Sequence, residues 1–322
     1  MAATATATGN GLISPFDLRD EDGYFWVKGN LHSHTTNSDG APPPQERLDG
    51  YVNQGYDFLC LSDHYKITFT NTVEAPDEFV LIQGAELHPN NPFGGKGHHF
   101  LAFGIHEDMD TLKMPPQHVI DSVKEQGGSI WLAHPHWSSV NIMRDTLPLK
   151  GLAGIEVFNT TCRCSGRGES SIHWDDWMDL DDKLYPALAN DDSHALESAE
   201  RDTYQGWNWA RVKERTPEAI MDALINGAGY TSTGPEIHDI QLKRTDDGSD
   251  NHRIIEATIR SSEVQRYYAV CDAYGSEYRE PGKTFETATF SIRANSRWVR
   301  FEAVGPDGTK AWSNPFDLTI FD

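Results

Sequence analysis

Histidines and carboxylates in this chain gather in short segments that lie far apart in the sequence. The chain has 322 residues and 14 histidines, and many of the histidines stand beside an aspartate or a glutamate. The segments are His32–Asp39, Asp63–His64, Glu86–His88, His98–His99, His134–His136, Glu156 and Asp191–His194. Imidazole and carboxylate groups together suit Zn, Mn or Fe. These residue types therefore predict a centre that holds two or three divalent cations, either Mn, Zn or Fe.

A centre of this kind predicts hydrolytic chemistry. A carboxylate such as Glu86 can bridge two cations, and cations about 3.5–4 Å apart clamp the attacking and leaving oxygens of a displacement. Cations also lower the pKa of bound water to about 7, so a metal-bridging hydroxide becomes the nucleophile. We therefore expect a metal-dependent hydrolase, with a phosphoesterase or phosphatase acting on a small organic phosphate as the favoured reaction. The alternatives are a hydrolase of carboxylic or carbamate esters on the same centre, and a non-catalytic metal- or carbohydrate-binding protein.

The elements that must position these groups are predicted by short apolar runs that alternate with helix-like segments. The predicted strands are Phe25–Leu31, Phe58–Ser62, Phe79–Gly84, His99–Gly104, Ser129–Ala133, Gly154–Asn159, Tyr185–Asn190, Trp207–Val212 and Gly229–Thr233. The predicted helices are Pro44–Asn53, Pro116–Gln126 and a segment that begins at Thr216-Pro217-Glu218 and ends before Gly227. Most of the strands are apolar throughout, as in parallel strands covered on both faces. The pattern indicates an α/β barrel or sheet, whose functional residues converge at the carboxyl ends of the strands.

The pattern changes after Gly234-Pro235, where helical periodicity ends. The strands expected there are Ile254–Ile259, Arg266–Asp272, Thr287–Ile292, Arg297–Val304 and Asn314–Ile320. They alternate apolar and polar residues and are separated by turn sequences, which predicts a small antiparallel β-sandwich. We therefore divide the chain into an N-terminal tail at residues 1–20, an α/β domain at residues 21–234 and a β-sandwich domain at residues 235–322.

Composition restricts the substrate and the location. The formal net charge of −22 disfavours nucleic acid, because its binding depends on lysines and arginines that release counterions. A small molecule is the expected partner, and it can be anionic because bound cations reverse the field locally. The chain has no apolar run of about 18 residues, so no contact with a membrane is expected. Residues 1–10 lack the features of a secretory signal, which makes the cytoplasm the expected location.

The ordered set of motifs resembles the PHP (polymerase and histidinol phosphatase) superfamily. The matching pieces are His32-x-His34, Ser38-Asp39-Gly40, Asp63-His64, Gly84-x-Glu86, His99, His134-Pro135 and Asp192-x-His194. The resemblance implies a distorted (β/α)7 barrel with a trinuclear metal centre. It implies as metal ligands His32, His34, Asp39, His64, Glu86, His99, His134, Asp192 and His194. We choose His99 over His98 because the segment 100–104 follows it as in related members.

The layout of the whole chain is also similar to a subgroup of metallohydrolases related to carbaryl hydrolase. The shared features are Gly29-Asn30-Leu31-His32-Ser33-His34 after an aromatic strand, Gly234-Pro235-Glu236, and a terminal β-domain that ends near Trp312-Ser313-Asn314-Pro315. This likeness implies that the same centre can cleave carboxylic or carbamate esters, which is why that alternative stays open.

Several further residues are candidates for supporting roles. A histidine at the edge of the cavity, for which we choose His136, would protonate the leaving group. Arg163 and Arg201 lie in loops and would clamp an anionic substrate. Glu156 either orients a ligating histidine or is a structural acid, and Asp63 either accepts a hydrogen bond from the ring of His64 or caps its strand. His88 either lines the pocket or lies in a loop.

Overall fold

The computed structural model describes residues 12–90, 97–195, 201–245, 254–272, 274–293 and 296–321. These residues form two compact units, each discontinuous in the chain. The unit that we call the α/β unit contains Val27–Asn208 and Glu214–Met221. The unit that we call the β unit contains Met1–Trp26, Trp209–Lys213 and Asp222–Asp322. The chain therefore passes between the units more than once, and the division into domains at residues 20 and 234 stays a prediction.

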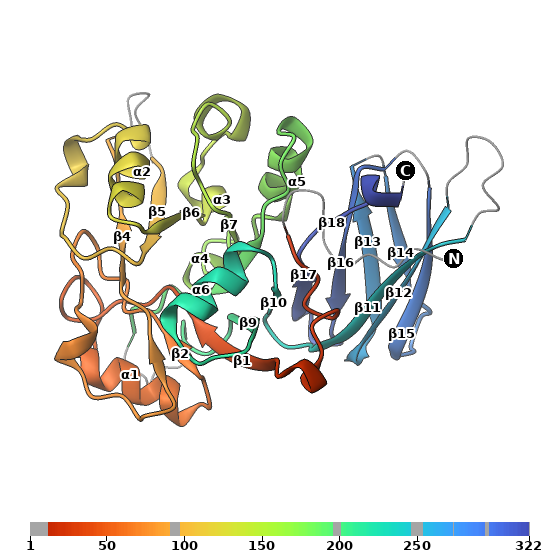
Figure 1. Cartoon of the computed structure of the whole chain (residues 1–322), viewed down its shortest axis with the longest axis horizontal. Helices are drawn as coiled ribbons and strands as arrows, with labels where there is room; N and C mark the ends of the chain where they lie inside the picture. The colour runs from red at the N-terminus through yellow and green to blue at the C-terminus, as the bar shows by residue number, and fades with distance from the viewer. Residues whose placement is uncertain are drawn as a thin grey trace. The chain divides into compact units, whose positions relative to one another are not determined.

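The strands of the α/β unit form two groups. In the first, β1 (Phe25–Asn30), β2 (Phe58–Leu59) and β3 (Val80–Leu81) pair in parallel. The second is a five-stranded sheet of β4 (Gly84–Leu87), β5 (His99–Phe103), β6 (Ser129–Ala133), β7 (Ile155–Asn159) and β8 (Ala187–Asn190), in that order (Figure 1). Strand β9 (Trp207–Val212) begins in this unit. The mixed α/β class is as predicted, whereas the seven-stranded barrel geometry stays a prediction.

The expectation of parallel strands, drawn from the apolar character of most of the runs, is wrong for part of the sheet. Strand β5 runs antiparallel to both β4 and β6, whereas β6, β7 and β8 are parallel to one another. An apolar run indicates that a strand is buried on both faces. A central antiparallel strand is buried in the same way as a parallel one. The apolar character of a run therefore does not predict whether its strand is parallel or antiparallel.

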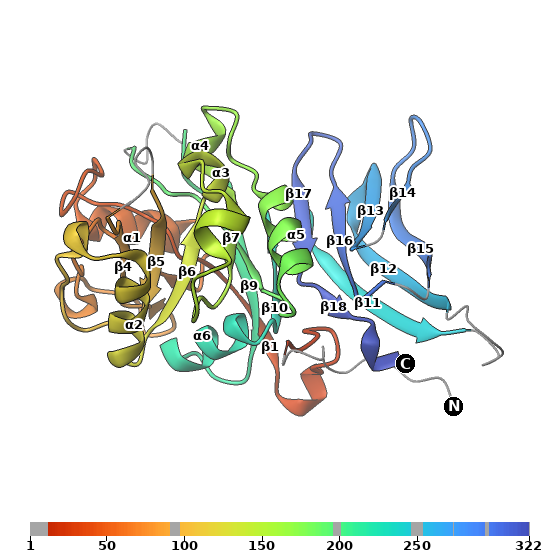
Figure 2. The same ribbon diagram turned by 90° about the horizontal axis from the view of Figure 1, so that it is seen from above.

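Helices lie beside these strands. They are α1 (Pro44–Asn53), α2 (Pro116–Glu125), α3 (Pro135–Ser138), α4 (Thr160–Arg163), α5 (Ser171–Leu180) and α6 (Pro217–Ile225). Short 3₁₀ turns occur at Asp20–Asp22, Thr70–Thr72, Thr111–Lys113 and Thr319–Phe321, and a π-helical turn at Ile142–Thr146. Helix α2 packs against β6 and α5 against β7 (Figure 2). The hydroxyl of Thr216 accepts a hydrogen bond from the N–H of Ala219 at 3.2 Å, which is the predicted cap of α6.

The β unit consists of two antiparallel sheets. One contains β11 (Ile237–Arg244), β12 (Ile254–Val264) and β15 (Phe285–Arg293). The other contains β14 (Gly275–Tyr278), β13 (Arg266–Cys271), β16 (Trp298–Val304), β17 (Lys310–Ser313) and β10 (Gly229–Ser232), with β18 (Phe316–Asp317) paired to β16. We assigned the segment of β10 to the α/β domain, but it pairs antiparallel with β17.

A single core joins the two sheets of the β unit, as a β-sandwich requires. It includes Ile240 and Ile259 from one sheet and Tyr267 and Phe301 from the other. Phe16 belongs to the same core and is 5% exposed, although it lies in the segment that we predicted to be an N-terminal tail. At least this part of the predicted tail is therefore packed.

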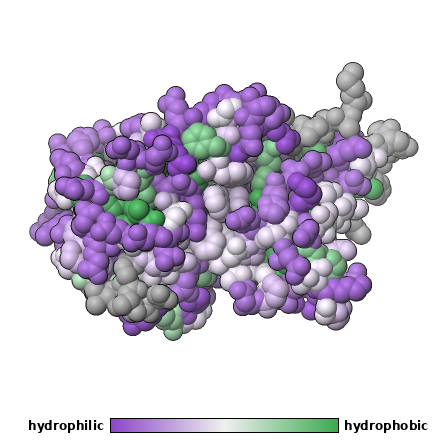
Figure 3. Space-filling model, turned by 90° about the horizontal axis from the view of Figure 1, so that it is seen from below, coloured by the Kyte–Doolittle hydropathy of each residue, from purple (hydrophilic) through white to green (hydrophobic). Residues whose placement is uncertain are grey.

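The surface visible in Figure 3 is mostly hydrophilic, with hydrophobic residues scattered over it. This agrees with the high content of acidic residues in the chain. Within the described ranges, every helix is too short or too polar to cross a membrane.

Strand β12 offers a test of the sandwich core, because its residues alternate between the core and the solvent. Ile259 is fully buried and Glu256 is exposed. We expect Ile259→Ala to lower the free energy of unfolding by about 2–5 kcal/mol, since it leaves a cavity. The control Glu256→Ala should change it by about 0.5 kcal/mol or less. Urea unfolding followed by circular dichroism would measure both, and equal effects would contradict the assigned faces.

Candidate metal centre

The predicted site residues meet at one edge of the strands of the α/β unit. His32 and His34 follow β1, and His64 follows β2. His134 follows β6, and Asp192 and His194 follow β8. His99 is the first residue of β5 rather than a residue after its end. Because β5 is antiparallel, its beginning lies at the same edge where β6 ends, and His99 pairs with Ala133 in the ladder. The reversed strand thus brings His99 beside His134.

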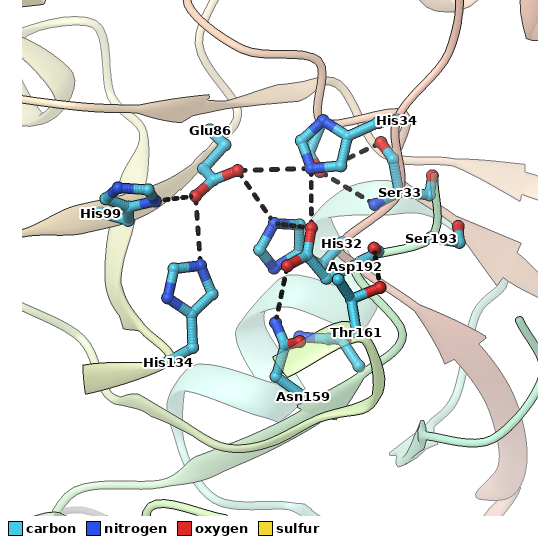
Figure 4. Close-up of polar contacts among 12 residues, drawn as sticks. His32, Ser33, His34, Glu86, His99, His134, Asn159, Thr161, Asp192 and Ser193 are labelled. Atoms are coloured by element: carbon cyan, nitrogen blue, oxygen red, sulfur yellow. Dashed lines mark hydrogen bonds and ion pairs between the residues drawn. The ribbon is translucent and has the colours of Figure 1, made fainter. Parts of the chain in front are cut away.

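The carboxylate of Glu86 lies at the centre of the cluster. The side chain belongs to β4 and is 1% exposed. Its Oε1 lies 2.6 Å from Nδ1 of His99, 3.3 Å from Nε2 of His88 and 3.3 Å from Nε2 of His134. Its Oε2 lies 3.1 Å from Nε2 of His32, 3.1 Å from Nδ1 of His64 and 3.3 Å from Nε2 of His34. Each carboxylate oxygen therefore faces three imidazole nitrogens, most of which are visible in Figure 4.

Asp192 is a second buried carboxylate on the same side as Oε2 of Glu86. Its Oδ1 lies 3.1 Å from Nε2 of His32 and 2.9 Å from Nε2 of His34. The amide of Asn159 donates to its Oδ2 at 3.2 Å. Asp192 has a left-handed backbone with φ of 55°, and so does His134 with φ of 24°. Such conformations are costly for residues other than glycine and gather at functional sites.

Asp39 is the third carboxylate and the most open to solvent, with 56% of its side chain exposed. Its Oδ2 lies 3.4 Å from Nε2 of His64, and its Oδ1 lies 3.4 Å from Nε2 of His194. Contact with the rings of His194 and His64 holds the pKa of Asp39 well below its ordinary value. The cluster thus runs from a fully buried interior to a partly open rim.

Unsatisfied atoms show that the cluster fits divalent cations. Nε2 of His34, Nδ1 of His64, Nε2 of His88 and Oδ1 of Asp192 are buried and make no hydrogen bond within the described part of the chain. Buried polar atoms are normally satisfied, so a convergence of unsatisfied donor atoms is the pattern of a metal site. Among the groups whose ligand atoms lie within 4.8 Å of one another are three that share the predicted ligands: His32, His34, Glu86 and Asp192; Glu86, His99 and His134; and His34, Asp39, His64 and His194.

Hydrogen bonds on the outer nitrogens orient several of these rings. Nδ1 of His32 lies 2.9 Å from Oε1 of Glu156, and Nδ1 of His134 lies 3.1 Å from Oγ of Ser138. Nδ1 of His194 lies 2.7 Å from the carbonyl oxygen of Asp192. A ring that donates its Nδ1 proton outward presents the lone pair of Nε2 inward, which is how ligating histidines are held.

The electrostatics of the buried part also suit cations. Burial lowers the pKa of His32, but the carboxylates of Asp192, Glu156 and Glu86 outweigh it and raise that pKa well above its ordinary value. Burial raises the pKa of Glu86, but the neighbouring rings of His32 and His99 hold it well below its ordinary value. Protons on imidazoles thus balance the buried carboxylates, and bound cations would take the place of those protons.

The structure decides between the two roles left open for Glu156. Its carboxylate accepts hydrogen bonds from Nδ1 of His32 and, at 3.0 Å, from the backbone N–H of His134. The amide groups of Asn159 and Asn190 also donate to it, at 3.0 and 2.9 Å. Glu156 therefore orients His32 and holds the strained backbone of His134. Each of its two carboxylate oxygens accepts two hydrogen bonds.

Asp63 has a different role from that of a partner for the ring of His64. It accepts hydrogen bonds from the backbone N–H of Thr35 at 2.8 Å, from the hydroxyl of Thr35 at 2.7 Å and from the hydroxyl of Ser38 at 2.7 Å. These bonds fix the loop that carries His34 and Asp39. Asp63 thus positions cluster residues through the backbone that bears them.

The histidine doublet is resolved by its position in β5. His99 points into the cluster, whereas the ring of His98 lies on the other side, 5.3 Å from the ring of Phe100 and 3.5 Å from the hydroxyl of Thr146. Sequence reasoning did not include His88 among the ligands, although its Nε2 faces Glu86. The spacing Glu86-x-His88 at a strand end was the available signal, because residues two apart on a strand share a face.

The residues predicted to contact substrate lie outside these groups. Nδ1 of His136 lies 2.8 Å from the carbonyl oxygen of Glu169, and its ring lies 5.5 Å from that of His173. Arg163 is exposed at the end of α4 and donates to the amide oxygen of Gln205. Arg201 is exposed as well. Their catalytic roles stay predictions.

Comparisons with known proteins identify the fold. No protein-family model matches the chain. A solved structure from Bacteroides vulgatus, described as a two-domain protein containing a predicted PHP-like metal-dependent phosphoesterase, is 17% identical with a TM-score of 0.52, covering 92% of this chain and 96% of that one. At this identity the likeness shows the fold alone.

Two uncharacterised proteins of Methanocaldococcus jannaschii are similar in sequence to part of the chain. One is 28% identical over 145 residues, and the other is 24% identical over 147 residues. The matched regions cover 42% and 41% of this chain. The chain spans only 54% of the first of these relatives. Both relatives are uncharacterised, so neither comparison assigns an activity.

The orienting role of Glu156 can be tested without any substrate. Glu156→Gln keeps the shape of the side chain but removes the charge that holds Nδ1 of His32. We expect the affinity for Zn or Mn to fall by about 10–100-fold, the effect typical of losing such a partner. Competition with a chromophoric chelator would measure it. The control Glu107→Gln, at an exposed position, should bind as the wild type does. Unchanged affinity in Glu156→Gln would contradict the role.

Proposed function

From the PHP-like fold of this chain and its cluster of imidazoles and carboxylates, we infer that it is a metal-dependent hydrolase. We propose that it cleaves phosphate esters of small organic molecules. The observation that carries the proposal is the carboxylate of Glu86, whose two oxygens each face three imidazole nitrogens. Such a bridging carboxylate is the central feature of sites that hold two or more cations.

Three groups of residues would hold the cations, of which Mn, Zn and Fe are the candidates. The inner group comprises His32, His34, Glu86 and Asp192, the second Glu86, His99 and His134, and the outer group His34, Asp39, His64 and His194. Bound cations supply Lewis acidity and lower the pKa of water to about 7. A trinuclear centre is the arrangement that uses all nine predicted residues.

The gradient of exposure gives the direction from which a substrate would approach. His32 and His34 are fully buried, whereas His64 and His194 are 18% and 25% exposed and Asp39 is more exposed still. A substrate would therefore enter on the side of Asp39, His64 and His194. The buried side excludes bulk water and keeps the rings fixed, which strengthens electrostatic interactions with charge that develops in the transition state.

A phosphate ester suits this site better than an uncharged one for electrostatic reasons. The net charge of −22 repels anions over most of the surface, so an anion binds where cations reverse the field. We propose that Arg163 adds a guanidinium clamp. Helix α4, which ends at Arg163, begins beside the site, since Asn159 caps it and the hydroxyl of Thr161 donates to the carbonyl oxygen of Asp192 at 2.6 Å. Arg201 is the second candidate for this role.

His136 is the proposed proton donor to the leaving group. Its Nδ1 proton is donated to the carbonyl oxygen of Glu169, so the ring must be in the imidazolium form for Nε2 to carry the proton that the leaving group takes. It follows His134 by two residues, at the start of α3. The role requires the leaving group to lie on the side of α3.

The proposal is tested with paired chromogenic esters after reconstitution with Mn, Zn or Fe. We expect hydrolysis of p-nitrophenyl phosphate and little hydrolysis of p-nitrophenyl acetate. His32→Ala and Asp192→Ala should lower kcat/KM by more than about 100-fold, since each removes a ligand rather than an outer partner. The control Glu107→Gln should keep wild-type activity.

Two results would overturn the proposal. Hydrolysis of the acetate or of a carbamate ester without hydrolysis of any phosphate ester would assign the centre to carboxylic or carbamate esters. Full activity in both His32→Ala and Asp192→Ala, with melting temperatures near that of the wild type, would remove the site itself.

A further inference from the structure

His88 is a member of the cluster that the motifs of the chain did not include. It lies directly after β4, two residues beyond Glu86. Its Nε2 lies 3.3 Å from Oε1 of Glu86, is buried and makes no hydrogen bond. The ring is stacked on that of His99, with centroids 3.6 Å apart and planes at 21°. Neighbouring rings thus fix the orientation of His88 toward the carboxylate.

His64 offers a second unsatisfied nitrogen to the same place. Its Nδ1 is buried without a hydrogen bond and lies 3.1 Å from Oε2 of Glu86. The rings of His64 and His88 stand edge to face, with centroids 4.6 Å apart. One ligand atom from each of His64, Glu86 and His88 lies within 4.8 Å of the others. Two unsatisfied imidazole nitrogens and a carboxylate oxygen therefore converge in a combination that none of the three groups assigned above contains.

Tyr65 holds the outer nitrogen of His88. Its hydroxyl oxygen lies 2.8 Å from Nδ1 of His88. The backbone of Tyr65 is left-handed, with φ of 61°, and its N–H donates to the carbonyl oxygen of Glu86 at 2.9 Å. A tyrosine in this conformation is unusual, and here its ring lies beside that of His88, with centroids 4.8 Å apart. If Nδ1 of His88 carries the proton and donates it to the Tyr65 oxygen, the lone pair of Nε2 faces Glu86.

We propose that His64, Glu86 and His88 hold a further divalent cation, through Nδ1 of His64 and Nε2 of His88, and that Tyr65 is the positioning residue for His88. The inference rests on the proposed function only in requiring that the centre bind cations. Two imidazoles and one carboxylate, with coordination positions left open, suit Fe(II) or Zn and not Mg or Ca. The partial exposure of His64 and His88, 18% each, leaves one side of this position open to solvent.

The assignment also gives His64 a definite role. Its two ring nitrogens face different carboxylates, since Nδ1 points to Glu86 and Nε2 lies 3.4 Å from Asp39. A neutral imidazole binds a cation through one nitrogen and carries its proton on the other. When Nδ1 serves the cation beside His88, the Nε2 proton is donated to Oδ2 of Asp39, and the outer group then holds its cation through His34, Asp39 and His194 without His64. Asp39 then positions His64 as Tyr65 positions His88.

The test is the number and affinity of bound cations, measured by calorimetry with Zn and by the visible absorption of bound Co. We expect His88→Gln to lower the stoichiometry by one cation per chain. Tyr65→Phe should keep the wild-type stoichiometry at saturation but weaken one cation by about 10–100-fold. His136→Gln is the matched control, because Nδ1 of His136 donates to the carbonyl oxygen of Glu169. This variant should bind the same number of cations as the wild type, with the same affinity.

The outcomes separate this inference from the proposed function. Wild-type stoichiometry and affinity in both His88→Gln and Tyr65→Phe would overturn the additional position, whatever the activity of the wild type. Loss of one cation in His88→Gln would support it even if p-nitrophenyl phosphate is not hydrolysed. The Tyr65→Phe variant keeps the test decisive if His88→Gln fails to fold, because it removes a single hydroxyl and leaves the ring in place.

Discussion

The buried carboxylate of Glu86 is the constraint on which the rest of the α/β unit depends. A charged group without water must be paired, and the cost of leaving it unpaired is several kcal/mol or more. Here six imidazole nitrogens surround it, and three of them, on His34, His64 and His88, make no hydrogen bond within the described part of the chain. Neutral rings can donate only one proton each, so the arrangement is balanced either by protons shared among the rings or by cations. The outer hydrogen bonds of the rings favour cations, because they commit the Nδ1 protons of His32, His134 and His194 elsewhere.

A second set of polar residues holds the loops that bring the ligands together. Arg47 of α1 is fully buried and donates to the carbonyl oxygens of His34, Ser193 and Ala195, at 3.1, 3.2 and 2.9 Å. It thus ties the loop after β1 to the loop after β8, although they are about half the chain apart in sequence. Asp63, which follows β2, holds the loop that carries Asp39 through its hydrogen bonds to Thr35 and Ser38. Precision at the centre therefore depends on backbone carbonyls and hydroxyls as much as on the ligands themselves.

The proposed chemistry and the additional cation position follow from the same gradient of burial. The interior of the cluster is closed and rigid, and its rim of Asp39, His64 and His88 is partly open. An acidic protein attracts an anion only where its charge is locally reversed. At the rim, bound cations would reverse the local charge and the site is open to solvent. We therefore assign both the substrate and the further cation to the rim.

The sequence by itself determined the chemical character of the site and the approximate place of several elements. The types and order of the histidines and carboxylates predicted a cation cluster, and the bounds of α1, β6 and β9 agree with the predicted ones. Only the tertiary structure decided the direction of β5, the orientation of the rings of His98 and His99, and the place of His88. The physical reason is that an apolar run indicates a buried strand, and parallel and antiparallel strands can be equally buried. Which ring faces Glu86 depends on strand direction and pairing, and these are fixed by contacts between residues far apart in the chain.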